Sequence, residues 1–129
     1  MPHLTLEYTG NVSEVIRPAE LLPELHQVLA QEAGIDIGNC KSRAIRRDDY
    51  CIGQGEDRQA FVHLEIRVLE GRSPEVKKAI GEHSLAVLEE HLASASPELD
   101  LQITVEIVDM QRAGYFKVVR GDGPGGYST

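Results

Sequence analysis

Four segments of this chain alternate apolar and polar residues, and they form two pairs, each pair separated by a segment with helical spacing. Alternation over four to eight residues is typical of a strand with one buried face, whereas apolar residues three and four apart are typical of a helix. The order strand, helix, strand is therefore expected twice along the 129 residues. This repeat constrains the fold more than any other feature of the sequence.

The first repeat is expected to contain strands over residues 3–8 and 42–51. Between them, leucine and valine residues recur at helical spacing from about Pro18 to Ala33, which predicts a helix. Pro23 lacks the N–H that the interior of a helix needs, so this helix could instead begin later than Pro18.

The second repeat is expected to contain strands over residues 60–69 and 101–108. A helix is predicted between them, with Ser73 as its N-cap, Pro74 as its first residue and an end near Ala93. Serine suits an N-cap because its hydroxyl accepts a free N–H of the first turn, where proline is tolerated as well.

Two consecutive strand-helix-strand units predict an α+β fold with a four-stranded mixed sheet and two helices on one face. We expect one domain over residues 1–129, with halves at about 2–52 and 59–117 joined by a hairpin near residues 53–58. The second face of the sheet would be bare, and its apolar positions would need a cover, which favours an oligomer. The glycine-rich residues 121–129 are expected to form a flexible tail.

The composition excludes several classes of function. A net charge of −8 disfavours nucleic acid as a partner, because phosphate binding needs a basic face. No stretch approaches the roughly 20 apolar residues of a membrane span, and no basic segment followed by an apolar run opens the chain, so we expect a cytoplasmic protein. Two cysteines are too few for a zinc site, and the five histidines lack metal-ligand spacing, so no metal is expected.

A basic cluster interrupts the acidic composition: Lys41, Arg43, Arg46 and Arg47 lie within seven residues. On a strand, Lys41 and Arg43 share one face, opposite Ala44. The cluster is either a solvated strand face that offsets the acidic surface or part of a site that binds an anion.

Pro2 is a candidate catalytic base. Because proline is small, Met1 is expected to be removed, which would expose a secondary amine. An ordinary α-amine titrates at roughly 7.7–8.0, and a secondary amine is more basic. Burial and nearby cations would lower its pKa toward the working pH, where a group can both remove and return a proton. Alternatively, Met-Pro is simply a common start of a chain.

Several short motifs occur in the order seen in the tautomerase superfamily. The chain resembles 4-oxalocrotonate tautomerase in a strand that ends in a Gly-Arg-Ser turn and in a last strand followed by an aromatic turn. It resembles more fully the family of 5-carboxymethyl-2-hydroxymuconate delta-isomerases, as far as about Lys117. The segments that carry this resemblance are Met1-Pro2-His3, Lys41-Ser42-Arg43, Ala60-Phe61-Val62-His63 and Gly71-Arg72-Ser73, whereas the aromatic turn of the first resemblance is Gly114-Tyr115-Phe116.

The two halves resemble two copies of the single 4-oxalocrotonate tautomerase unit that divide its functional residues. The first half has Pro2 but carries Asn11 where the turn arginine would stand. The second half has Arg72 in that turn but no proline at the start of its first strand. The resemblance therefore implies one catalytic amine per chain.

The resemblance also implies a reaction. The enzyme would be a cofactor-independent isomerase of aromatic-compound catabolism that moves a proton in a dienol or unsaturated 2-oxo acid such as 5-carboxymethyl-2-hydroxymuconate. Pro2 would be the general base and acid, while Arg43 and Arg72 would bind carboxylate and developing oxyanion charge. Lys41 and Phe116 would contact the substrate, a small di- or tricarboxylate. The protein would be a homotrimer, in which Pro2 of one subunit could meet arginines of the next.

Other interpretations stay open at this level. The amine could serve a tautomerase or hydratase that acts on another 2-oxo acid, or the chain could be a trimeric module that binds an anionic ligand without turnover. Arg72 alone would be a surface arginine, and Arg43 one member of a polar strand. Phe116 could equally pack in the core.

Overall fold

The computed structural model describes residues 1–121, and the tail expected over residues 121–129 lies outside this part except for Gly121. Short 3-10 turns separate several of the main elements. The strands and helices are, in chain order, β1 (His3–Thr9), α1 (Pro18–Ala33), β2 (Lys41–Arg47), β3 (Gln59–Leu69), α2 (Pro74–His91) and β4 (Asp100–Met110).

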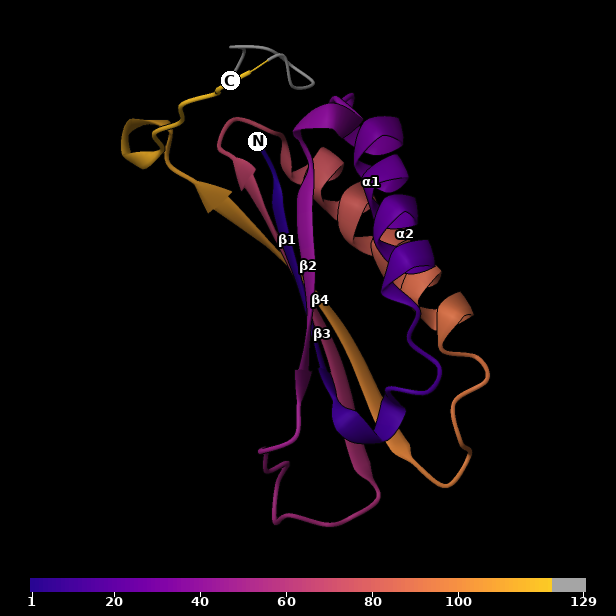
Figure 1. Cartoon of the computed structure of the whole chain (residues 1–129). Helices are drawn as coiled ribbons and strands as arrows, with labels where there is room; N and C mark the ends of the chain where they lie inside the picture. The colour runs from indigo at the N-terminus through magenta and orange to yellow at the C-terminus, as the bar shows by residue number, and fades with distance from the viewer. Residues whose placement is uncertain (122–129) are drawn as a thin grey trace.

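The four strands form one mixed sheet in the order β2-β1-β3-β4 (Figure 1). β1 is parallel to β2 and β3 is parallel to β4, as expected for two strand-helix-strand units. The central pair, β1 and β3, is antiparallel. Both helices lie on the same side of the sheet. The predicted α+β fold, a four-stranded mixed sheet with two helices on one face, is therefore confirmed.

The core lies between the sheet and the two helices. Leu4 and Leu6 of β1 and every second side chain of β3, such as Leu64, face the helices and are fully buried. Leu25 of α1 and Ile80 of α2 complete this layer. Because full burial of one such side chain contributes about 1.5–3 kcal/mol, the alternation fixes which face of the sheet packs against the helices.

α1 begins at Pro18, and the later start that Pro23 allowed is wrong. Pro23 lies inside the helix on its exposed side. The bond that Pro23 cannot donate would have gone to the carbonyl of Ala19, an exposed residue, so water can take its place. Gly34 ends the helix at a φ of 64°, a left-handed conformation that glycine adopts without strain.

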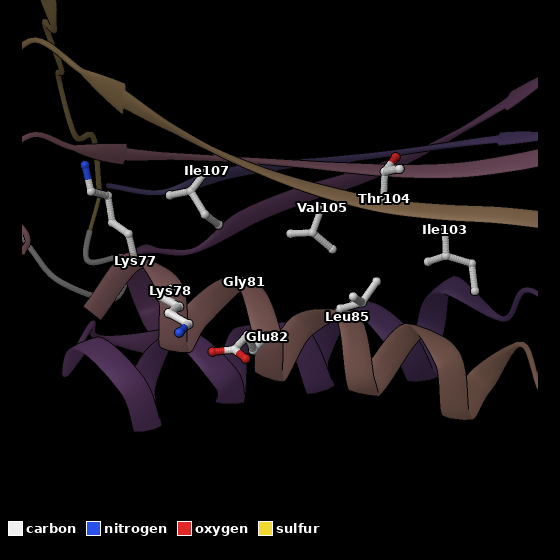
Figure 2. Close-up of a pocket in the computed structure, with 9 residues that line it drawn as sticks. All are labelled: Lys77, Lys78, Gly81, Glu82, Leu85, Ile103, Thr104, Val105 and Ile107. Atoms are coloured by element: carbon white, nitrogen blue, oxygen red, sulfur yellow. The ribbon is translucent and has the colours of Figure 1, made fainter. Parts of the chain in front are cut away.

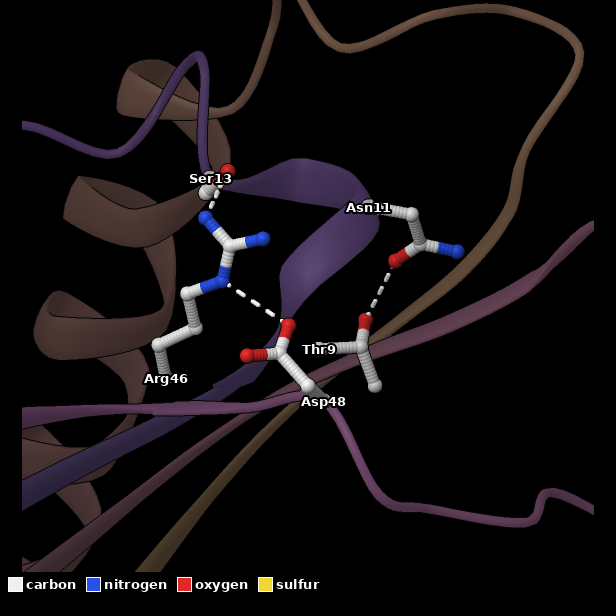
Figure 3. Close-up of polar contacts among 5 residues, drawn as sticks. All are labelled: Thr9, Asn11, Ser13, Arg46 and Asp48. Carbon is white, nitrogen blue, oxygen red and sulfur yellow. Dashed lines mark hydrogen bonds and ion pairs between the residues drawn. The ribbon is translucent and has the colours of Figure 1, made fainter.

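β2 ends at Arg47, so the strand predicted over residues 42–51 is too long. Aspartate is a poor strand former, and two aspartates follow Arg47. The first of them, Asp48, accepts a hydrogen bond of 2.9 Å from Nε of Arg46, whose Nη1 donates to Ser13 (Figure 3). The chain therefore leaves the sheet edge early, and the connection to β3 is longer than predicted.

The second repeat follows the sequence pattern closely. Oγ of Ser73 accepts the N–H of Val76 at 3.2 Å, so Ser73 is the N-cap of α2 as predicted. α2 ends at His91, slightly before the expected end near Ala93, because Leu92 has left the helical conformation. β4 is longer than the predicted strand, since its pairing with β3 continues to Met110.

The sheet face away from the helices carries mostly polar side chains. His3 of β1, Arg43 of β2, and His63 and Glu65 of β3 all lie on it. Within residues 1–121, no helix covers this face (Figure 1). A second chain that covers it would have to match charges as well as bury apolar groups. No helix in this part of the chain is long and apolar enough to cross a bilayer.

Candidate active site

The amino end of β1 lies beside the start of β2 and the end of β3. The carbonyl of Pro2 accepts a 3.1 Å hydrogen bond from the main-chain N–H of Lys41, and His3 pairs with Arg67 of β3. Met1 is only 6% exposed, and Pro2 is buried as well. The start of the chain is therefore held inside the fold, where a terminal amine is partly desolvated.

The amine at this end of the sheet has a perturbed pKa. The pKa of the Met1 α-amine is lowered from its ordinary value of 8.0, mainly because burial disfavours the charged form. The positive charges of Arg72, Lys117 and Lys41 lower it further, whereas Cys40 acts in the opposite direction. These cations belong to three separate segments, so the fold brings them around the amine.

Arg72 stands in the turn between β3 and α2. Gly71 precedes it at a φ of 119°, which favours glycine. Nη1 of Arg72 donates a 3.0 Å hydrogen bond to the carbonyl of Leu69, so the half-buried guanidinium folds back toward the end of β3. Because β1 begins beside that end, the charge of Arg72 acts on the amine of its own chain.

The first two cations of the basic cluster, Lys41 and Arg43, lie on the same face of β2 but make different hydrogen bonds. Lys41 and Arg43 share the open face of the sheet, as the alternation predicts. Nη2 of Arg43 lies 3.1 Å from Nδ1 of His3, whereas Nζ of Lys41 donates to the carbonyl of Asn39 at 3.2 Å. Lys41 lowers the pKa of the amine. The pKa of His3 is itself lowered, first by burial and then by Arg43.

A cavity of about 200 Å³ opens next to these residues, lined by Leu69, Arg112, Tyr115 and Lys117. Two of its lining residues relate the cavity to the amine. The charge of Lys117 lowers the pKa of the amine, and the carbonyl of Leu69 accepts a hydrogen bond from Arg72. None of its polar side chains was a candidate from the sequence alone. Tyr115 and Lys117 are half-buried between exposed neighbours, a pattern that only the folded chain shows, because the outward-facing residues are the apolar Phe116 and Val118.

Phe116 lies apart from this cavity. Its side chain is 87% exposed, so the alternative that it packs in the core is wrong for the single chain. Because the segment is extended here, adjacent side chains point in opposite directions, and Tyr115 faces the protein where Phe116 faces outward.

The opposite end of the sheet, where the second repeat begins, has no comparable arrangement. Asn11, which stands where the turn arginine would be expected, accepts a 2.6 Å hydrogen bond from Thr9 (Figure 3). Its amide nitrogen donates to the carbonyl of Gln59 at 3.0 Å. Asn11 therefore closes a turn and brings no positive charge to this end.

A second cavity, of about 400 Å³, lies between α2 and β4 on the helix side of the sheet (Figure 2). Leu85, Val105 and Ile107 are among the apolar side chains that line this open groove. Lys77 lies at one end, where its ammonium donates to Asp109 at 3.1 Å. The cavity holds no arrangement of an amine with several cations, so it is not the candidate site.

The remaining chemistry-bearing side chains form no second centre in the part of the chain that the structure describes. Within residues 1–121, no three His, Cys, Asp or Glu side chains are placed to hold a metal ion. Cys40 and Cys51 are free thiols. Burial raises the pKa of the Cys40 thiol, which keeps it protonated and weakly nucleophilic.

Comparisons with known proteins agree with this fold. The family model of 5-carboxymethyl-2-hydroxymuconate isomerase matches residues 2–119. The 5-carboxymethyl-2-hydroxymuconate Delta-isomerase of Escherichia coli is 25% identical over 117 residues, which cover 91% of this chain and 93% of that protein. A crystal structure of a 5-carboxymethyl-2-hydroxymuconate isomerase from Deinococcus radiodurans R1 is 40% identical, with a TM-score of 0.83 over 92% of this chain and 90% of that one.

A more distant structure, a fused 4-OT described as a symmetric trimer, shares the fold with a TM-score of 0.70. It is 17% identical to this chain, and 94% of each chain is covered. The resemblance expected from the sequence motifs is thus confirmed: this chain belongs to the 5-carboxymethyl-2-hydroxymuconate isomerase family and is an enzyme of the isomerase class.

Proposed function

We propose that this isomerase moves a proton in a dienol or unsaturated 2-oxo acid such as 5-carboxymethyl-2-hydroxymuconate, with the amine of Pro2 as base and acid. The observation that carries the proposal is the buried start of the chain, where Arg72, Lys117 and Lys41 lower the pKa of the Met1 amine. The family membership supports the reaction class. The enzyme would serve aromatic-compound catabolism in the cytoplasm.

Removal of Met1 is the first requirement. Because Met1 is buried at the end of β1, its loss would leave the secondary amine of Pro2 at the same end of the sheet. Burial and the same cations would act on that amine, which is more basic than a primary one. Its pKa would therefore fall toward the working pH, where general acid–base catalysis is most effective.

The reaction would be a proton transfer in two steps. The neutral amine of Pro2 removes the proton of the 2-hydroxyl group, or one from an adjacent carbon. The electron pair shifts through the conjugated double bonds, and the protonated amine returns a proton to a distal carbon. Atoms and charge balance without an oxidant or a cofactor.

The cations would bind the substrate and its developing charge. The guanidinium of Arg72 can hold a carboxylate through two parallel hydrogen bonds. Arg43 and Lys41 add positive charge from β2, which suits a di- or tricarboxylate. Donors that are fixed before the reaction stabilise an oxyanion without rearrangement, and this lowers the barrier.

We also infer a homotrimer. The open sheet face lacks a helical cover within residues 1–121, and Phe116 and Val118 are 87% and 83% exposed. A fused 4-OT described as a symmetric trimer has the same fold. In a trimer, Phe116 would wall a site next to a neighbouring subunit. Native mass spectrometry tests this, and a monomer at working concentrations would contradict it.

The proposed function is tested with purified protein and 5-carboxymethyl-2-hydroxymuconate. Intact mass should show loss of Met1, and Pro2→Ala should lower kcat by on the order of 10²-fold or more. Pro97→Ala, a change in an exposed loop, is the matched control and should be as active as the native protein. An active enzyme that retains Met1, or a fully active Pro2→Ala variant, would show that the amine mechanism is wrong.

The family membership makes the chain an enzyme and excludes the module that only binds an anion. The same assays test the choice of substrate. A tautomerase or hydratase of another 2-oxo acid would convert other compounds in a panel of 2-hydroxydienoates faster than 5-carboxymethyl-2-hydroxymuconate.

A further inference from the structure

His3 lies between two side chains that are far apart in the sequence. Its Nδ1 is 3.1 Å from Nη2 of Arg43 on β2. Its Nε2 is 3.0 Å from the hydroxyl of Tyr115, which follows β4. The two rings also meet edge to face, with centroids 6.0 Å apart. One imidazole thus connects the basic cluster of β2 to the segment after the last strand.

The chemistry of arginine fixes the direction of both hydrogen bonds. A guanidinium has only donors, so Nδ1 of His3 must be the acceptor and carry no proton. The neutral ring then has its proton on Nε2 and donates it to the oxygen of Tyr115. The hydroxyl proton of Tyr115 is therefore left for another acceptor.

The position of Tyr115 indicates where that acceptor lies. Tyr115 lines the 200 Å³ cavity together with Leu69, Arg112 and Lys117. Tyr115 contacts His3, which follows Pro2 in the chain, so the cavity adjoins the proposed catalytic base. Lys117 is also one of the cations that act on the amine. An acceptor in this cavity would be surrounded by positive charge, which suits an anionic oxygen.

We propose that the hydroxyl of Tyr115 donates a hydrogen bond to an anionic oxygen of the substrate, and that neutral His3, held by Arg43, is the positioning residue that orients it. This inference rests on the proposed function, because the substrate is taken to be a carboxylate-bearing dienol. It adds Tyr115 to the substrate-binding residues and gives His3 a role that depends on its tautomer.

Variants of both residues test the proposal. They are assayed as purified protein in its native assembly, with 5-carboxymethyl-2-hydroxymuconate as the substrate. Tyr115→Phe should lower kcat/KM by about ten- to a hundredfold, the effect of one hydrogen bond to a charged group. Tyr50→Phe, on an exposed loop at the far end of β2, is the matched control and should leave kcat/KM unchanged.

Two replacements of His3 separate its two contacts. The amide of asparagine lies near the place of Nδ1, and the amide of glutamine near the place of Nε2. His3→Asn should therefore lose as much as Tyr115→Phe, whereas His3→Gln should recover most of the activity. The double variant His3→Asn/Tyr115→Phe should match Tyr115→Phe alone within about twofold, because the two residues act as one unit. If the loss of kcat/KM in the double variant equals the product of the two single losses, His3 does not act through Tyr115 and the positioning role is wrong.

The tautomer gives a readout that does not depend on turnover. Proton–nitrogen correlation spectra of the imidazoles should show His3 neutral, with its proton on Nε2, and a proton on Nδ1 would overturn the proposal. An active native enzyme with an equally active Tyr115→Phe variant would contradict this inference alone. A native protein without isomerase activity would contradict the proposed function as well.

Discussion

The main-chain N–H of Lys41 donates to the carbonyl of Pro2 across 3.1 Å, so the first residue of β2 is bonded to the residue before β1. This bond extends the parallel ladder to the start of the chain. It holds the amine beside a lysine of one repeat, while the end of β3 brings Arg72 from the other repeat. The candidate site therefore depends on both repeats within one chain.

Arg72 should contribute to substrate binding. Arg72→Ala should lower kcat/KM by about ten- to a hundredfold, because a charged hydrogen-bonding partner of the carboxylate is lost. Arg72→Lys should lose part of this, since lysine keeps the charge without the planar pair of donors. Steady-state kinetics on 5-carboxymethyl-2-hydroxymuconate would measure both variants.

The control for Arg72 is Arg58→Ala. Arg58 is exposed, pairs with Asp100 at 3.2 Å and lies at the start of β3, far from the amine. The Arg58→Ala variant should keep the native value of kcat/KM. If Arg72→Ala is as active as Arg58→Ala, Arg72 does not belong to the site.

The acid limb of the pH profile should follow the amine. Because the base must be neutral, kcat/KM should fall as the pH drops through the pKa of the amine. Burial and Arg72 lower the pKa of the Met1 amine by disfavouring the cation, and they should act in the same way on the amine of Pro2. Removing the charge of Arg72 should raise it, so the acid limb of Arg72→Ala should move to higher pH. A limb that stays in place or moves to lower pH would show that Arg72 does not act on the base.

Much of the fold follows from the alternation of residues in the sequence. Leu4 and Leu6 face the helices because they alternate with polar residues, and this was sufficient to predict β1. The end of β2 could not be predicted in this way. It depends on the contact of Arg46 with Asp48 and Ser13, of which Ser13 lies in a different segment.

The candidate site was only partly predictable, for a physical reason. Pro2 and Arg72 were found because each stands in a local motif. His3 and Tyr115 are 112 positions apart and meet only in the folded chain. The motif around Phe116 pointed to the right segment, but the sequence does not show which of two adjacent aromatic residues faces inward.

Gly71 should be needed for its backbone conformation and not for space. At a φ of 119°, alanine would be strained, although its methyl group would meet no atom within 4 Å. Gly71→Ala should therefore destabilise the fold by about 1–3 kcal/mol and displace Arg72. Urea unfolding would measure the loss, and kcat/KM should fall with it.

Gly114→Ala is the matched control for Gly71→Ala. Its methyl group would also meet no atom within 4 Å, but Gly114 does not have a positive φ. Its free energy of unfolding should stay within about 0.5 kcal/mol of the native value. Equal effects of the two substitutions would exclude backbone strain as the cause.

Thr9 should stabilise the end of the sheet that lacks the active site. Its side chain is fully buried, accepts the N–H of Phe61 at 3.2 Å and donates to Asn11 at 2.6 Å. Thr9→Val removes the hydroxyl and leaves that partly buried N–H without its acceptor, which should cost about 1–3 kcal/mol of unfolding free energy. Because Thr9 lies at the opposite end of β1 from Pro2, kcat/KM should stay native. Thr104→Val also removes a hydroxyl, which lies 2.7 Å from Nδ1 of His63 on an exposed position of β4. Because water can replace this exposed contact, Thr104→Val should cost less than about 1 kcal/mol. If the two variants are equally stable, the hydroxyl of Thr9 is not required, and a fall in kcat/KM for Thr9→Val would show that the two ends of the sheet are coupled.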